Sequence, residues 1–296
     1  MLKTDQQLAA RYPKLLIKGL TLAMEATGAK QGIIALKAKY KEAITALEPY
    51  VTEQLQISIM PDIYPAGDEV ITIWLTTGRR VPPGGIPLNI GVIVNNVQTL
   101  INVARAYDGE PVTTRTLTVT GAVKNPITVT VPIGTSLREV LELAGGGRAD
   151  DLVYINGGPM MGTVITDLTD PVTKTTGLRA KGLKYQGELG NVDPMAKHRL
   201  IPTSRLIDRL NLRSLYSEAP LSEERYVPDE VTLKLQQHIG APAIALVKVG
   251  DVVSHGQVVG EIPEGSLGAR IHASIDGTVI QVTPQTITIR KGGAAK

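Results

Sequence analysis

The sequence predicts a multidomain α/β protein, and three observations support this fold class. Apolar strands alternate with helices over residues 1–110, whereas the strands predicted over 116–120 and 127–131 alternate apolar and polar residues strictly. Residues 231–293 contain short apolar strands separated by glycine turns. A chain of 296 residues is long enough for about two or three domains.

Residues 1–110 are predicted to form a partial Rossmann-like layer of parallel strands covered by helices. Leu8, Tyr12, Leu15 and Leu16 follow helical spacings of three and four, and Gly28 lies where that helix would end. The expected elements, in order, are a helix over 5–27, a strand over 32–36, a helix over 39–51, a strand over 55–59 and a helix over 69–77.

Residues 111–178 are predicted to form a β-grasp domain. Strands over 116–120 and 127–131 form a hairpin, which is followed by a helix over 137–143 and a strand over 153–155. The segment resembles a soluble-ligand-binding β-grasp module. The glycines at 145–147 could suggest a phosphate-binding loop, but no strand precedes them and no helix follows. We therefore interpret them as the end of the helix.

Residues 179–230 are predicted to be a linker with one helix near 203–212, and residues 231–296 a separate β-rich domain. Residues 247–253 and 271–279 resemble the two halves of a barrel-sandwich hybrid, the fold of biotinyl and lipoyl carriers. The tip that would carry the modified lysine, residues 263–266, has no lysine, so we expect no swinging arm. We expect this domain to fold autonomously.

The segment Val94–Leu100 is the strongest candidate for a binding site. Asn95 and Asn96 follow an apolar run that is predicted to be a strand, and a helix-like pattern begins after them. Such a strand-to-helix junction presents backbone N–H groups and a dipole that favour an anion, for example a phosphate. The alternative is that one asparagine simply caps the helix.

Several motifs, in family order along nearly the whole chain, resemble one family of electron-transfer proteins. The segment at 94–100 resembles the Val-Asn-Asn-Val-Glu-Thr-Leu segment of the FMN- and NADH-binding subunit of respiratory complex I, and Gly67-Asp68-Glu69 its Gly-Glu-Glu turn. Residues 84–87 and 157–162 resemble the C subunit of the Rnf complex. The C-terminal motifs at 192–196, 237–242 and 271–273 are similar to cobalamin reductases of propanediol-utilisation microcompartments.

This resemblance implies roles for six residues. Gly67, Asp68 and Glu69 would border the isoalloxazine and the nicotinamide, while Asn95, Asn96 and Thr99 would contact the flavin. The alternative for Asp68 and Glu69 is that they begin a helix, where their charges favour the dipole.

The resemblance conflicts with the composition at one point, because the chain contains no cysteine. Cobalamin reductases carry two four-cysteine iron–sulfur motifs between the β-grasp and C-terminal parts, and a cluster needs such thiolates. Here residues 173–178 run almost directly into 180–185, so we expect the 4Fe-4S segment to be missing. We also expect the family's N-terminal glycine-rich flavin loop to be absent, in a trimmed chain or a natural remnant. Without that loop over the phosphate, we expect FMN to bind weakly or not at all.

Composition, charge and histidine spacing bear on membrane insertion, nucleic-acid binding and metal binding. The sequence has no apolar run of about 18 residues and no apolar signal core, so it predicts neither a membrane span nor a leader and favours the cytoplasm. Residues 174–213 hold nine Lys or Arg against three acidic residues, which we interpret as a linker and helix face rather than a nucleic-acid site. His238, His255 and His272 lack the spacing of a helical metal site.

The predicted function is electron transfer from NADH through FMN and iron–sulfur clusters to cob(II)alamin, impaired here by the missing cluster ligands. The resemblance implies a bacterial microcompartment as the location, with cobalamin adenosyltransferase and shell or cargo proteins as partners. The alternative is a non-catalytic scaffold whose β-grasp and sandwich domains dock a partner.

Overall fold

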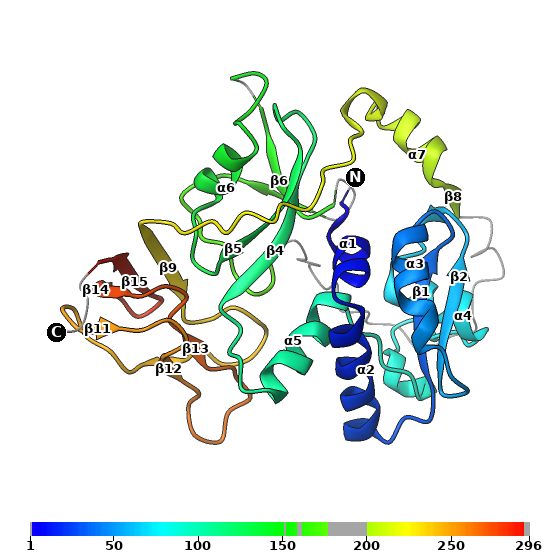
Figure 1. Ribbon diagram of the computed structural model, residues 1–296, viewed down its shortest axis with the longest axis horizontal. Helices are drawn as coiled ribbons and strands as arrows, with labels where there is room; N and C mark the ends of the chain where they lie inside the picture. The colour runs from blue at the N-terminus through cyan, green and yellow to red at the C-terminus, as the bar shows by residue number, and fades with distance from the viewer. Residues whose placement is uncertain (1, 151, 159–161, 177–199, 293–296) are drawn as a thin grey trace. The chain divides into compact units, whose positions relative to one another are not determined.

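The computed structural model describes residues 2–150, 152–158, 162–176 and 200–292. The chain divides into two compact units (Figure 1). One unit comprises residues 5–108 and 181–214, and we call it the α/β unit. The other comprises residues 1–4, 109–180 and 215–296, and we call it the β unit.

The α/β unit contains a parallel pair of strands with helices. Strand β1 pairs in parallel with β2, from Gly32 opposite Leu55 to Lys37 opposite Met60. The elements are α1 Thr4–Arg11, α2 Pro13–Thr27, β1 Gly32–Lys37, α3 Lys41–Leu47, η1 Glu48–Tyr50, β2 Leu55–Met60, β3 Ile63–Tyr64, α4 Glu69–Thr77, η2 Pro87–Ile90, α5 Val97–Tyr107, β8 Ile201–Pro202 and α7 Thr203–Arg209. The predicted alternation of helices and strands up to residue 77 is confirmed.

The single helix predicted over 5–27 is wrong, because the structure has two helices that meet at Tyr12 and Pro13. Proline has no N–H to donate and its ring crowds the preceding turn, so it favours the first position of a new helix. Helix α2 ends as predicted at Gly28, which has a φ of 70°.

Helices α2 and α5 approach closely in the core of the α/β unit. A Cβ on Gly19 of α2 would lie 1.9 Å from the carbonyl oxygen of Leu100 in α5, so only glycine fits at this crossing. The surrounding core consists of Leu8, Ala9, Leu16, Ile34, Leu36, Ala43, Leu47, Leu100 and Ile101.

The β unit begins with the predicted β-grasp order of hairpin, helix and strand. The elements are β4 Thr114–Val119, β5 Ile127–Pro132, α6 Leu137–Leu143, β6 Tyr154–Asn156 and β7 Thr163–Ile165, with β4 antiparallel to β5 and β6 to β7. Ser136 and Glu139 form a capping box at the start of α6. Gly145 and Gly146, both with positive φ, end this helix, as predicted.

The C-terminal strands form two sheets rather than a closed barrel in the described part of the chain. A four-stranded sheet has the order β11-β14-β15-β9, and a three-stranded sheet has the order β10-β12-β13. The strands are β9 Glu230–Lys234, β10 Ile244–Ala245, β11 Val252–Val253, β12 Val258–Glu261, β13 Ile271–His272, β14 Gly277–Val282 and β15 Thr286–Lys291, after the short η4 Arg213–Leu215.

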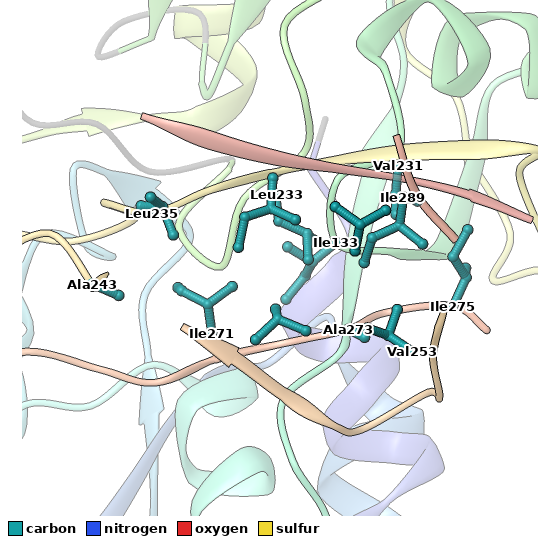
Figure 2. Close-up of a cluster of buried hydrophobic side chains, with 13 residues drawn as sticks. Ile133, Val231, Leu233, Leu235, Ala243, Val253, Ile271, Ala273, Ile275 and Ile289 are labelled. Carbon is teal, nitrogen blue, oxygen red and sulfur yellow. The ribbon is translucent and has the colours of Figure 1, made fainter. Parts of the chain in front are cut away.

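The core of these sheets includes one residue from the β-grasp segment, while the autonomous folding of the C-terminal domain stays a prediction. Ile133, which follows β5 of the β-grasp segment, is 1% exposed and packs among the side chains of β9 and β13 (Figure 2). The Ser274 hydroxyl donates to the Ile133 carbonyl over 2.5 Å. Gly134 brings its backbone to within hydrogen-bonding distance of Thr232. The β-grasp segment therefore contributes Ile133 to the C-terminal core.

Candidate functional site

The carboxyl ends of β1 and β2 carry a cluster of charged side chains. Lys37 is the last residue of β1, Lys39 follows it, and Asp62 follows β2. One carboxylate oxygen of Asp62 accepts from Lys37 Nζ over 2.9 Å, and the other accepts from Lys39 Nζ over 2.8 Å. The Thr203 hydroxyl also donates to Asp62, over 2.8 Å.

Asp62 is held as a carboxylate by these contacts. Partial burial by itself would raise its pKa, but the hydrogen bonds from Lys39, Lys37 and Thr203 together lower the pKa to about 2. Strands β3 and β8 pair beside this cluster, with Tyr64 opposite Ile201, so the segment that begins at residue 200 is anchored to this end of the sheet. Ligands of parallel sheets generally bind at the carboxyl ends of the strands.

The predicted turn at 67–69 precedes α4. The Asp68 carboxylate accepts from the N–H groups of Val70 and Ile71 over 3.0 and 3.3 Å, so it caps the helix. Gly67 is exposed, and a Cβ built there would meet no atom of the described residues within 4 Å. Glu69 is exposed on the first turn. Thus Asp68 has the capping role that was the alternative, while Gly67 and Glu69 face solvent.

Asn96 is the N-cap of α5. Its side-chain oxygen accepts from the Gln98 N–H over 2.9 Å, and its amide nitrogen donates to Asp5 over 3.0 Å. Asn95 and Thr99 are exposed. The strand predicted before Asn95 is wrong, because Pro87–Ile90 is a 3₁₀ helix and residues 92–96 are irregular. Gly91 has a φ of 67° and ends the 3₁₀ helix, so it interrupts the extended backbone that a strand through Ile90 and Val92 would need.

The loop between α4 and α5 exposes apolar side chains. Arg79 donates to the Ile90 carbonyl over 3.1 Å, and the Ile86 N–H donates to the Asn89 side chain over 2.8 Å, so both bonds order the loop. The exposed apolar residues in or next to this loop are Ile86, Leu88, Ile93 and Val94. An exposed apolar surface beside polar groups is typical of a binding site.

The described contacts of the two capping residues lie within the α/β unit, and the structure brings Asn96 to Asp5 rather than to the 67–69 turn. Sequence reasoning missed the Lys37, Lys39 and Asp62 cluster. Its signal was present, since the lysines follow one predicted strand and the aspartate follows the next. These residues meet because β1 and β2 pair in parallel, which places the ends of both strands at the same edge of the sheet.

The three histidines of the C-terminal region, of which only His272 lies on a strand, have different surroundings. His238 accepts from the Gly240 N–H over 2.9 Å, and a ring nitrogen of His255 lies 3.0 Å from the Thr113 hydroxyl. Burial first, and then the charges of Lys174 and Arg270, lower the pKa of His272. No group of three or more His, Asp or Glu residues within the described ranges is arranged to hold a metal ion.

Family comparisons match all three parts of the chain. Residues 1–105 match the Nuo51 FMN-binding domain, residues 116–164 the SLBB domain, and residues 213–295 the RnfC barrel sandwich hybrid domain. Cobalamin reductase PduS of Salmonella typhimurium is 42% identical over 395 aligned residues, which cover 99% of this chain and 88% of that protein. The chain belongs to the cobalamin reductase family.

Other relatives agree with this family assignment. Cobalamin reductase PduS of Citrobacter freundii is 43% identical over the same shares of both chains. The C component of the Na⁺-translocating ferredoxin:NAD⁺ oxidoreductase complex of Acetobacterium woodii is 36% identical over 181 residues, 59% of this chain and 40% of that component.

The basic segment noted in the sequence lies largely at 177–199, outside the described residues. No described helix could cross a membrane.

Proposed function

We propose that this member of the cobalamin reductase family is an electron-transfer flavoprotein that takes electrons from NADH through FMN and passes them to a cobalamin acceptor. The observation that carries the proposal is the 42% identity to a cobalamin reductase over 99% of the chain. The match of residues 1–105 to an FMN-binding domain supports the choice of cofactor.

The α/β unit has surface chemistry that fits a flavin. A flavin combines an apolar ring system with polar edges and a phosphate, and such a ligand needs both apolar and hydrogen-bonding partners. Exposed Ile86 and Ile93 supply apolar area, and Asn95 and Thr99 supply exposed polar groups. Among the described residues, none lies within 4 Å of a Cβ built on Gly67. The parallel pairing of β1 and β2 supports the proposed Rossmann-like layer.

The chain's own residues would bind and orient the cofactor. When bound, FMN would supply the redox chemistry by accepting a hydride and releasing electrons. Gly67, Glu69, Asn95 and Thr99 are proposed to contact it, while Asp68 and Asn96 act indirectly by capping the helices that carry these neighbours.

The family's iron–sulfur clusters do not fit this chain, because it has no cysteine to ligate them. The alignment with the Salmonella relative is 395 residues long, whereas this chain has 296, which supports a segment in that relative without a counterpart here. We therefore propose that electrons do not pass through a cluster held by this chain.

An anaerobic titration tests the proposed function. The full chain is mixed with FMN, its affinity is measured by flavin fluorescence, and NADH is then added while flavin absorbance is followed. We expect FMN to bind and to be bleached by NADH, with no iron or sulfide found by chemical analysis after reconstitution. Absence of FMN binding would contradict the proposal, and a stoichiometric cluster would contradict the part that concerns iron and sulfur.

A docking role is the second candidate, and the β6–β7 hairpin favours it. Val153, Ile155 and Val164 are 70%, 45% and 60% exposed, and Ile155 lies opposite Val164 on the hairpin. Exposed apolar side chains gathered on one hairpin are typical of protein interaction sites. Pull-down of an adenosyltransferase or a shell protein by the full chain, lost on Val164→Asp, would support docking.

Residence in a bacterial microcompartment belongs to the same proposal. It is supported by the relationship to the PduS cobalamin reductases. Co-purification of the chain with isolated microcompartments is the expected result, and recovery only in the free protein fraction would contradict it.

A further inference from the structure

The carboxyl edge of the β1–β2 sheet has an excess of positive charge. Lys37 and Lys39 share a single carboxylate, Asp62, so the three groups together carry a net charge of about +1 while Asp62 is ionised. This edge is the end of the sheet where α/β folds bind their ligands. A net positive charge there favours an anionic group.

The two lysines differ in what they can offer to such a group. The side chain of Lys37 is only 14% exposed, and its amine contacts Asp62, the Ile63 carbonyl and the Thr203 hydroxyl. The side chain of Lys39 is 39% exposed, and its bond to Asp62 uses one of its three N–H donors. Lys39 is therefore the residue placed to reach a ligand.

We propose that Lys39, held in position by Asp62 and Lys37, binds a phosphate group of the nucleotide at the carboxyl edge of this sheet. The inference rests on the proposed function for the identity of the nucleotide, which is FMN or NADH. Both carry phosphate, and a lysine acts toward phosphate as a mobile point charge. Thr203 contributes by fixing the other side of Asp62.

A purely structural role makes a different prediction. Asp62 anchors the start of α7 through Thr203, and the Thr203 N–H donates to the Asp62 carbonyl over 3.0 Å. That anchor needs Lys37 and Thr203, whose contacts would survive the loss of Lys39. If the cluster were only an anchor, removing the charge of Lys39 would leave nucleotide affinity unchanged.

The test compares Lys39→Gln with Lys30→Gln. Lys30 is exposed and precedes β1, so the control removes the same charge at the opposite end of the strand. Dissociation constants are measured at one ionic strength for FMN against riboflavin, and for NADH against reduced nicotinamide riboside. Each pair differs by its phosphate groups, and NADH also by its adenosine part.

We expect Lys39→Gln to weaken the affinity for FMN or for NADH by about tenfold, the size of a lost charge-assisted hydrogen bond. The affinity for the phosphate-free counterpart of that nucleotide should stay unchanged. The ligand that weakens shows which nucleotide supplies the phosphate. Lys30→Gln should change neither, and Lys39→Arg should restore most of the affinity because it restores the charge.

Three results would overturn the inference: unchanged affinity for FMN and NADH, an equal loss for the phosphate-free ligands, or an equal loss in Lys30→Gln. If the wild-type chain binds neither FMN nor NADH, the proposed function fails, and inorganic pyrophosphate becomes the probe. Pyrophosphate binding that is lost in Lys39→Gln would support the phosphate site, and absence of pyrophosphate binding would overturn it.

Discussion

The C-terminal core buries apolar side chains, whereas the carboxyl edge of the β1–β2 sheet keeps charged side chains partly exposed. The core gathers thirteen buried apolar residues from several strands, and six of them are 0% exposed. The carboxyl edge instead holds Lys37, Lys39 and Asp62 in partly exposed ion pairs, and the α/β unit also exposes apolar residues such as Leu88.

This difference links the core to the stability of the fold and the edge to ligand binding. Removing apolar surface from water contributes about 25 cal/mol per Å², so the closed core stabilises the β unit. Partly exposed charges contribute little to stability, but they remain available to a ligand. We therefore expect substitutions in the core to change unfolding, and substitutions at the edge to change mainly affinity.

The largest expected effect is that of Ile133→Ala, which tests whether the β-grasp segment completes the C-terminal core. Ile133 is 1% exposed, so the substitution leaves a cavity and should lower the free energy of unfolding by about 3 kcal/mol. Denaturant unfolding measures it. Ile155→Ala, at a 45% exposed position, should cost less than about 0.5 kcal/mol. Equal losses would show that Ile133 is not part of a shared core.

Gly134→Ala tests the same junction through the backbone. Gly134 has a φ of 97°, and an added Cβ would lie 2.9 Å from the Cβ of Val231 and 3.0 Å from the backbone nitrogen of Thr232. We expect a loss of about 2 kcal/mol from strain and crowding. Gly146→Ala is the control, because Gly146 has a φ of 77° but nothing within 4 Å of a built Cβ. A loss of the same size in both variants would show that crowding at Gly134 adds nothing.

Asn96→Ala separates capping from flavin contact in the α/β unit. Loss of the N-cap of α5 should cost about 1 kcal/mol of stability, measured by thermal unfolding. Asn95→Ala, at an exposed neighbour, should leave stability nearly unchanged but lower the affinity for FMN if the proposed contact exists. If Asn95→Ala leaves flavin affinity unchanged, Asn95 does not contact the cofactor.

Asp62→Asn should produce the smallest effect on stability and a defined dependence on pH. The pKa of Asp62 falls to about 2 in the folded chain, below its ordinary 3.8, so the folded state favours the carboxylate. The associated stability is present above about pH 4 and is lost as pH falls toward 2. Because the side chain is 44% exposed, solvent screening should limit the effect to about 0.5 kcal/mol.

Measuring the free energy of unfolding of both proteins between pH 3 and pH 7 checks this sign. The wild type should be the more stable protein near pH 7, and the gap should narrow at the acid end. A gap that widens toward acid would contradict the assigned ion pairs.

Local chemistry by itself determined most of the elements. Helix α4 begins after Asp68 and ends at Gly78, and α6 begins at a capping box and ends at two glycines, because each signal acts within one turn of the chain. The same reasoning anticipated that Asp68 or Asn96 could be a cap. It failed before Asn95, where apolar residues followed Pro87 without forming a strand.

Only the tertiary structure decided how distant segments complete one another. The packing of Ile133 among residues 231–289 and the sharing of Asp62 by Lys37, Lys39 and Thr203 both join groups far apart in sequence. Periodicity shows which side of a strand is buried but not which segment covers it. Complementary charges likewise attract only after strand pairing brings them within a few ångströms, so the candidate phosphate site could be inferred from the fold and not from the order of residues.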